Sequence, residues 1–150
     1  PVALLLSMYC LQAWIFPSTS CMGIFPFNLQ AETTRILLIG PIPSTLSQIP
    51  NLKVLNLEQN SLSGEIPRLI YWNEVLQYLG LRGNKLGGTL SPNMCQFTGL
   101  WYFDVRNNSL TGSIPENIGN CTAFQVLDLS YNQLTGEIPF NIGFLQVDTL

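Results

Sequence analysis

Apolar residues recur along most of this chain with a fixed spacing, and one asparagine marks each recurrence. Asn60, Asn84, Asn108 and Asn132 each stand 24 residues after the one before. The apolar residues around them follow the frame L-x-x-L-x-L-x-x-N-x-L. They are Leu52, Leu55, Leu57 and Leu62; Leu76, Leu79, Leu81 and Leu86; Leu100, Phe103, Val105 and Leu110; and Phe124, Leu127, Leu129 and Leu134. A period this regular indicates a repeated structural unit.

The second half of each unit repeats equally strictly. A glycine is followed two residues later by an aliphatic residue, in the pairs Gly40 and Ile42, Gly64 and Ile66, Gly88 and Leu90, Gly112 and Ile114, and Gly136 and Ile138. A proline then follows in four of the five units, at Pro43, Pro67, Pro115 and Pro139, while Ser91 takes this place in the third. One further apolar column completes the unit: Leu46, Ile70, Met94, Ile118 and Ile142.

This frame predicts the path of the chain. Alternation with period two predicts a short strand with leucines facing inward, and stacked units then form a parallel sheet. The asparagine side chains can satisfy backbone groups at the turn after each strand, from coil to coil. The glycine permits a tight turn, and the Ile-Pro pair favours an extended return over a full helix.

The predicted fold is therefore a leucine-rich-repeat solenoid of the α/β class, with short parallel strands on its concave face and irregular or 3-10 structure on its convex side. Residues 38–150 would hold a half repeat, four full repeats and the start of another, so that the solenoid is truncated at both ends. Residues 1–37 fit no repeat, since Ile36 occupies the position one period before Asn60. We expect this apolar segment to be a signal remnant or non-homologous sequence, because it is short for a membrane span and contains Pro17 and Pro26.

Composition excludes several functions. The chain has no histidine, the commonest general base and metal ligand, and no cysteine spacing typical of a zinc site. Its formal net charge of −3 offers no basic patch for nucleic acid. We therefore expect no enzyme activity, no cofactor, no metal and no nucleic-acid partner.

Two features suit an oxidising, secretory environment. Cys95 and Cys121 are one repeat plus two residues apart, so neighbouring coils can bring them together as a disulfide; equally, Cys121 continues an apolar column and is explained as core. Two sequons start at Asn107 and Asn120. We favour Asn120 as the glycosylation site because a glycan on Asn107 would crowd the asparagine ladder at Asn108.

The outward residues of successive strands should form columns on the concave face. Tyrosine and arginine in such columns are typical of protein interfaces. The residues that we expect to contact a ligand or partner are Tyr78, Arg82, Tyr102, Asp104, Arg106 and Tyr131. A solvated face with only local pairs, such as Arg106 with an aspartate, is the alternative.

The unit endings LSGEIP, LTGSIP and LTGEIP resemble the plant-specific class of leucine-rich repeats on cell-surface receptors. From about residue 38 to 150, runs such as GPIPSTLSQIPNLKVL and GLWYFDVRNNSLTGSIPENIGNCTAFQVLDLSYNQLTGEIP most resemble the ectodomain of the ERECTA group of receptor kinases. This resemblance implies an extracellular domain at the plasma membrane that binds secreted cysteine-rich peptides with a second leucine-rich-repeat protein or co-receptor kinase. The membrane span and serine/threonine kinase would lie outside this chain. The alternative is a stand-alone secreted or surface scaffold, such as a receptor-like protein or a wall-enzyme inhibitor.

Overall fold

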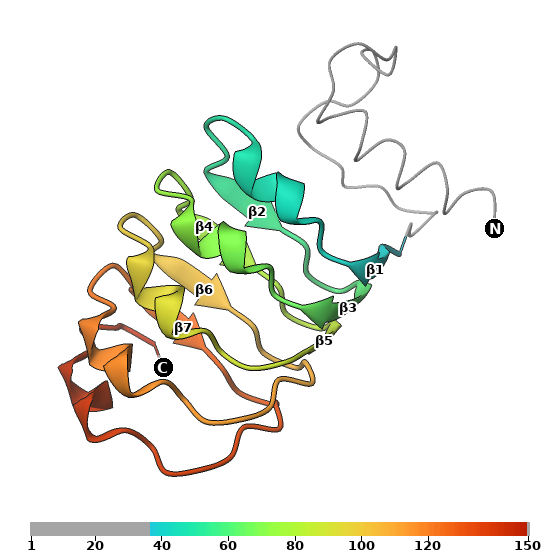
Figure 1. Ribbon diagram of the computed structural model, residues 1–150. Helices are drawn as coiled ribbons and strands as arrows, with labels where there is room; N and C mark the ends of the chain where they lie inside the picture. Colours follow the sequence, from blue (N-terminus) through green and yellow to red (C-terminus); the bar gives the residue numbers. More distant parts are fainter. Residues whose placement is uncertain (1–36, 150) are drawn as a thin grey trace, which may run out of the picture.

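Five coils are stacked in a single row in the computed structural model, which describes residues 37–149 (Figure 1). The predicted segment 1–37 lies outside the described residues except for Leu37. The elements run in the order β1 (Ile39–Pro41), η1 (Ser44–Gln48), β2 (Val54–Asn56), β3 (Ser61–Glu65), η2 (Arg68–Trp72), β4 (Tyr78–Gly80), β5 (Lys85–Gly87), η3 (Pro92–Gln96), β6 (Tyr102–Asp104), η4 (Glu116–Asn120), β7 (Val126–Asp128) and η5 (Phe140–Phe144), where η marks a 3-10 helix.

The predicted concave sheet is present, and the predicted solenoid fold is confirmed. Strands β2, β4, β6 and β7 pair in parallel in that order, which we call the concave sheet. Their middle residues, Leu55, Leu79, Phe103 and Leu127, lie directly beside one another and are buried. Since the side chains of a strand alternate between faces, the residues on either side of each middle residue face outward.

A second parallel sheet was not anticipated. Strands β1, β3 and β5 pair in parallel and form this sheet (Figure 1). Strands β3 and β5 follow the concave strands β2 and β4 along the chain, in a segment where the sequence suggested only an extended return. The regularity of this sheet has a local cause, because the ladder asparagines hold the start of this segment in register: the Leu62 N–H donates to Oδ1 of Asn84, 3.0 Å away. The pattern extends past β5, where the Thr111 N–H donates to the Gly88 carbonyl.

The convex side consists of the five 3-10 helices. Four of them follow the repeated proline, whose fixed φ suits the extended residue before a helix and whose carbonyl accepts the first i to i+3 hydrogen bond, as from Ile70 to Pro67. Ser91, where the proline column breaks, caps η3 instead: its Oγ accepts from the Asn93 N–H at 3.1 Å. The substitution therefore preserves the helix start by other means.

Each ladder asparagine joins two coils. Asn108, only 9% exposed, shows the full pattern. Its Oδ1 accepts from the Leu86 N–H at 3.0 Å, and its Nδ2 donates to the carbonyls of Leu81 (3.0 Å) and Val105 (2.9 Å). Leu81 and Leu86 belong to the preceding coil, so a single side chain satisfies backbone groups of both. Asn84 and Asn132 repeat this geometry.

The ladder gives a testable prediction. Asn108→Ala leaves one N–H and two carbonyls of the interior without these partners, at about 1–3 kcal/mol for each unsatisfied group. We expect a loss of roughly 3–5 kcal/mol in the free energy of unfolding, measured by urea denaturation.

Asn117→Ala is the matched control. Asn117 makes one exposed coil-to-coil hydrogen bond, to the Pro92 carbonyl, and its Oδ1 has no partner. Its replacement should cost about 1 kcal/mol or less. Equal losses for the two variants would contradict the role of the ladder.

Candidate functional site

The outward columns of the concave sheet bring several of the predicted contact residues together. Register places Tyr78 beside Tyr102, and Gly80 beside Asp104. The two phenol rings stack with centroids 4.2 Å apart and planes 5° from parallel. Trp101, which immediately precedes β6, meets both rings edge-on at 6.1 and 5.7 Å and keeps 41% of its surface exposed.

The hydroxyl of each stacked tyrosine is hydrogen-bonded to a carboxylate. The Tyr78 hydroxyl donates to Oε1 of Glu58 at 3.0 Å, and the Tyr102 hydroxyl donates to Oδ2 of Asp104 at 3.3 Å. Burial, and then the neighbouring Glu58 carboxylate, raises the pKa of Tyr78 well above its ordinary value. Burial likewise raises the pKa of Tyr102. Both phenols therefore remain neutral donors at physiological pH.

Gly80 makes room for this arrangement. A Cβ at Gly80 would overlap Glu58 Oε1 and stand 2.9 Å from Cε1 of Tyr78. The Glu58 carboxylate therefore occupies the space that a side chain at Gly80 would fill. We call Glu58, Tyr78, Gly80, Trp101, Tyr102 and Asp104 the acid–aromatic cluster.

Three of its members, Glu58, Gly80 and Trp101, were not among the predicted contact residues. Glu58 appears in an outward column, and only its contact with Tyr78 distinguishes it from its neighbours. Trp101 lies outside the alternating positions of the strand, so no column includes it. The available signal in the sequence was a tryptophan one residue before a strand that contains Tyr102 and Phe103.

Asp104 serves the backbone as well as the surface. It is only 4% exposed, and its Oδ1 accepts from the Arg106 N–H at 2.8 Å. Asn56 and Asp128 make the same turn, accepting from the N–H of Glu58 and Ser130. This column of the concave face thus closes the ends of β2, β6 and β7, a role that the sequence pattern did not predict.

The remaining predicted residues lie further along the coils. The Arg106 guanidinium carbon stands 4.8 Å above the Tyr131 ring, a cation–π contact, and Tyr131 is 71% exposed. Arg82 is exposed, in the coil before Arg106. The structure therefore presents two groups: the acid–aromatic cluster, with Tyr78, Tyr102 and Asp104, and the Arg106–Tyr131 pair.

The position before each ladder asparagine has left-handed backbone. φ is +56° at Gln59, +71° at Gly83, +54° at Asn107 and +54° at Tyr131. Three side chains there carry a conformational cost of roughly 1–2 kcal/mol each, which the neighbouring asparagine hydrogen bonds offset.

The other predicted sites are the Cys95–Cys121 pair and the two sequons. The structure joins Cys95 and Cys121 in a disulfide, with Cα atoms 4.3 Å apart, between η3 and the residue after η4. Cys121 is also buried, so both explanations offered by the sequence apply to the same residue. Asn107 and Asn120 are exposed, at the concave edge and on the convex side, and the preference for Asn120 stays a prediction.

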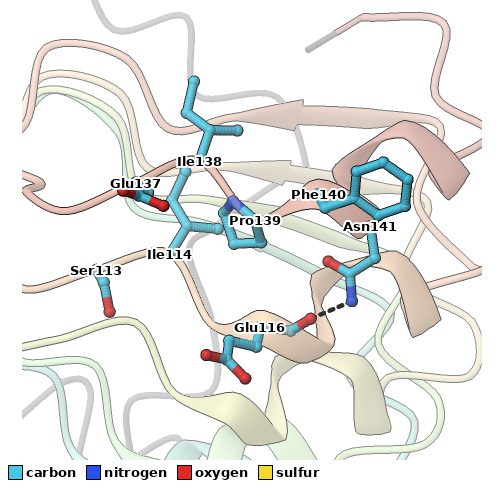
Figure 2. A pocket seen from close by; sticks show the side chains of 8 residues that line it. All are labelled: Ser113, Ile114, Glu116, Glu137, Ile138, Pro139, Phe140 and Asn141. Atoms are coloured by element: carbon cyan, nitrogen blue, oxygen red, sulfur yellow. Dashed lines mark hydrogen bonds between the residues drawn. The ribbon is translucent and has the colours of Figure 1, made fainter.

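A hollow of about 510 Å³ lies between the Ile-Pro turns of the last two coils (Figure 2). Ser113, Ile114 and Glu116 form one wall, and residues 137–141 form the other. The Asn141 amide donates to the Glu116 carbonyl across it. None of the predicted contact residues lines this space, and its two glutamates point in different directions (Figure 2). Within residues 37–149 no three acidic or cysteine side chains are grouped as a metal site requires, and no helix there is long and apolar enough to cross a bilayer.

Comparison with known sequences identifies the class of protein that this fold and surface define. The Leucine Rich Repeat family matches residues 51–72, 75–97, 99–121 and 123–145. The chain belongs to this family. A comparison with the curated proteins gives no match.

Solved structures that the chain resembles include receptors and receptor kinases of plants. The chain is similar to the plant peptide hormone receptor RGFR1, solved in complex with RGF2, with 38% identity, a TM-score of 0.72, and coverage of 76% of this chain and 18% of that one. It is also similar to the Arabidopsis receptor kinase HAESA, solved with the peptide hormone IDA and the co-receptor SERK1, with 29% identity, a TM-score of 0.69, and coverage of 73% and 18%. A plant ice-binding protein matches with 31% identity, a TM-score of 0.70, and coverage of 75% and 38%.

The chain spans about a fifth of the length of the receptor ectodomains that it resembles. Those folds are binding domains, and neither the family nor these neighbours indicates a catalytic domain in this chain.

The left-handed backbone before each ladder asparagine gives a prediction about Gly83. Gly83→Ala places a Cβ at φ +71°, close to the Gln59 amide, and should lower the free energy of unfolding by about 1 kcal/mol in a urea titration. Gly87→Ala is the matched control, because its Cβ meets only the Ser109 carbonyl, at 3.8 Å, and no left-handed φ is required there. Its effect should be neutral or slightly stabilising. Equal free energies of unfolding for Gly83→Ala and Gly87→Ala would contradict the strain argument.

The disulfide gives a second prediction. The bridged cysteines are 26 residues apart, and closing a loop of this length stabilises the folded chain by about 3 kcal/mol. Cys95→Ala should show this loss in thermal or urea unfolding and leave Cys121 in the core. Cys121→Ala should cost roughly 1 kcal/mol more, because it also removes buried volume. Reduction of the unaltered chain should reproduce the Cys95→Ala loss, and an unchanged midpoint after reduction would contradict it.

Proposed function

We propose that this chain is part of the extracellular ligand-recognition domain of a plant receptor kinase, closest to the ERECTA group. In this proposal it binds secreted cysteine-rich peptides together with a second leucine-rich-repeat receptor or co-receptor kinase, in developmental signalling. It acts on the extracellular side of the plasma membrane, to which the parent protein is anchored. Residues 38–150 belong to the repeat domain, and residues 1–37 are a signal remnant or non-homologous sequence.

The observation that carries this proposal is the exposed set of aromatic and charged groups on the concave sheet. A sheet face needed only for stacking requires no exposed tryptophan at its edge and no cation held over an exposed tyrosine ring. Tyr, Trp and Arg are the residues on which protein recognition most often depends. The neighbours solved with peptide hormones, and with a co-receptor, support a peptide as the ligand and a co-receptor as the partner.

A second candidate function is a stand-alone secreted or surface scaffold. The plant ice-binding protein favours it, since it resembles this chain as closely in fold as HAESA does. The two candidates differ in what the parent protein contains. A membrane span and a kinase signature downstream of the repeats support the receptor, and a polar cap followed by a stop codon supports the scaffold.

The test is binding to a panel of secreted cysteine-rich peptides, measured by calorimetry on the secreted chain. We expect at least one peptide to bind, and Tyr102→Ala and Arg106→Ala each to weaken binding by roughly tenfold or more. The matched controls are Arg68→Ala and Glu116→Gln on the convex helices, both at exposed positions, which should leave affinity unchanged. Absence of binding by every peptide, or a loss confined to the convex variants, would reject the concave face as the recognition surface.

A further inference from the structure

The outward column at the end of the concave strands is interrupted once. Asn56, Asp104 and Asp128 each accept a backbone hydrogen bond at this position, while Gly80 has no side chain to do so. The space above Gly80 holds the Glu58 carboxylate instead, and register places Asp104 on the adjoining strand. Two carboxylates from coils that are not adjacent therefore border the same glycine.

Neither carboxylate receives a hydrogen bond from a cation in the described chain. Glu58 accepts from the Tyr78 phenol, and Asp104 accepts from the Tyr102 phenol and a backbone N–H. Arg106 follows Asp104 by two residues, yet its guanidinium lies over the Tyr131 ring. The cluster thus holds two carboxylates beside three aromatic rings, and no cationic side chain of the described residues is hydrogen-bonded to either carboxylate.

Aromatic rings and carboxylates share one preferred ligand. The face of a Tyr or Trp ring attracts Lys and Arg cations, and a carboxylate forms its strongest hydrogen bonds with the same groups. An apolar ligand would remove water from the partly exposed Glu58 carboxylate without compensating it. A metal ion is disfavoured, because no third acidic or cysteine side chain joins the two within residues 37–149.

We propose that the acid–aromatic cluster receives a cationic side chain, a guanidinium or ammonium group, from the bound protein or peptide. The inference rests on the proposed function and adds the chemistry of the ligand. The partly exposed Glu58 accepts a hydrogen bond from the cation, the nearly buried Asp104 contributes its negative charge from the adjoining coil, and Trp101, with the stacked tyrosines, forms the wall beside the cation.

The probe is acetyl-Gly-Arg-Gly amide, compared with the peptide in which neutral citrulline replaces arginine. Binding to the full chain is followed by the NMR signal of the Trp101 indole N–H, assigned with Trp101→Phe. The arginine peptide should shift this signal in a saturable way, and the citrulline peptide should bind at least about tenfold more weakly.

Conservative variants locate the interaction. Glu58→Gln and Asp104→Asn keep hydrogen-bond acceptors for Tyr78 and for the Arg106 N–H, so the fold should persist while affinity for the arginine peptide falls about tenfold. Gly80→Ala displaces the Glu58 carboxylate and should have the same effect. Glu116→Gln, on η4, is the control and should bind as the unaltered chain does.

Equal binding of the two peptides, or unchanged binding after both Glu58→Gln and Gly80→Ala, would overturn the proposal. The outcome is separate from that of the receptor function. A cysteine-rich peptide whose binding depends on Arg106 and Tyr131 but not on Glu58 would leave the receptor function standing and remove this inference. Saturable binding of the arginine probe by a chain that binds no cysteine-rich peptide would support this inference and reject the receptor function.

Discussion

The structure depends on hydrogen bonds that run from coil to coil rather than within a coil. Asn108 joins the backbone at Leu81 and Leu86 to its own strand end at Val105, and Asn84 and Asn132 repeat the same contacts. Because each asparagine fixes the register of two coils at once, the concave sheet and the second sheet are aligned together. The stability of any one coil is therefore a property of its interfaces.

That constraint leaves the outward positions of the concave sheet free to vary. Inward positions must be apolar and turn positions must satisfy the backbone. Side chains that can contact a ligand are therefore concentrated in a few outward columns, in which successive members lie one strand spacing apart. Stacking of Tyr78 on Tyr102 follows directly from this geometry, since parallel register sets equivalent residues side by side about 4.8 Å apart. Recognition chemistry thus emerges from repetition, with each coil supplying one element of a shared surface.

The repeat frame made the fold predictable and the site only partly so. Periodicity placed the strands and the buried leucines, and it predicted irregular or 3-10 structure on the convex side, because these are set by residue type at fixed spacing. It did not reveal the second sheet, whose regularity comes from hydrogen bonds to the next coil's asparagine. Nor did it reveal the Glu58–Tyr78 contact, which joins neighbouring coils through long side chains whose rotamers no column specifies. Asp104 lies in an outward column of the concave sheet, yet its near-complete burial follows from the turn that it closes.

Departures from the repeat are accordingly the most informative positions in the chain. Ser91 departs from the proline column, and its hydroxyl restores the helix start, so that departure is structurally compensated. Gly80 departs from the Asn/Asp column, and no side chain restores the lost backbone hydrogen bond; a carboxylate from the preceding coil fills the space instead. A departure that another group compensates, as at Ser91, preserves the solenoid. An uncompensated departure that gathers charge beside aromatic rings, as at Gly80, contributes nothing to the stacking of the coils. The same comparison, applied column by column, separates residues that maintain a repeat protein from those that give it a ligand.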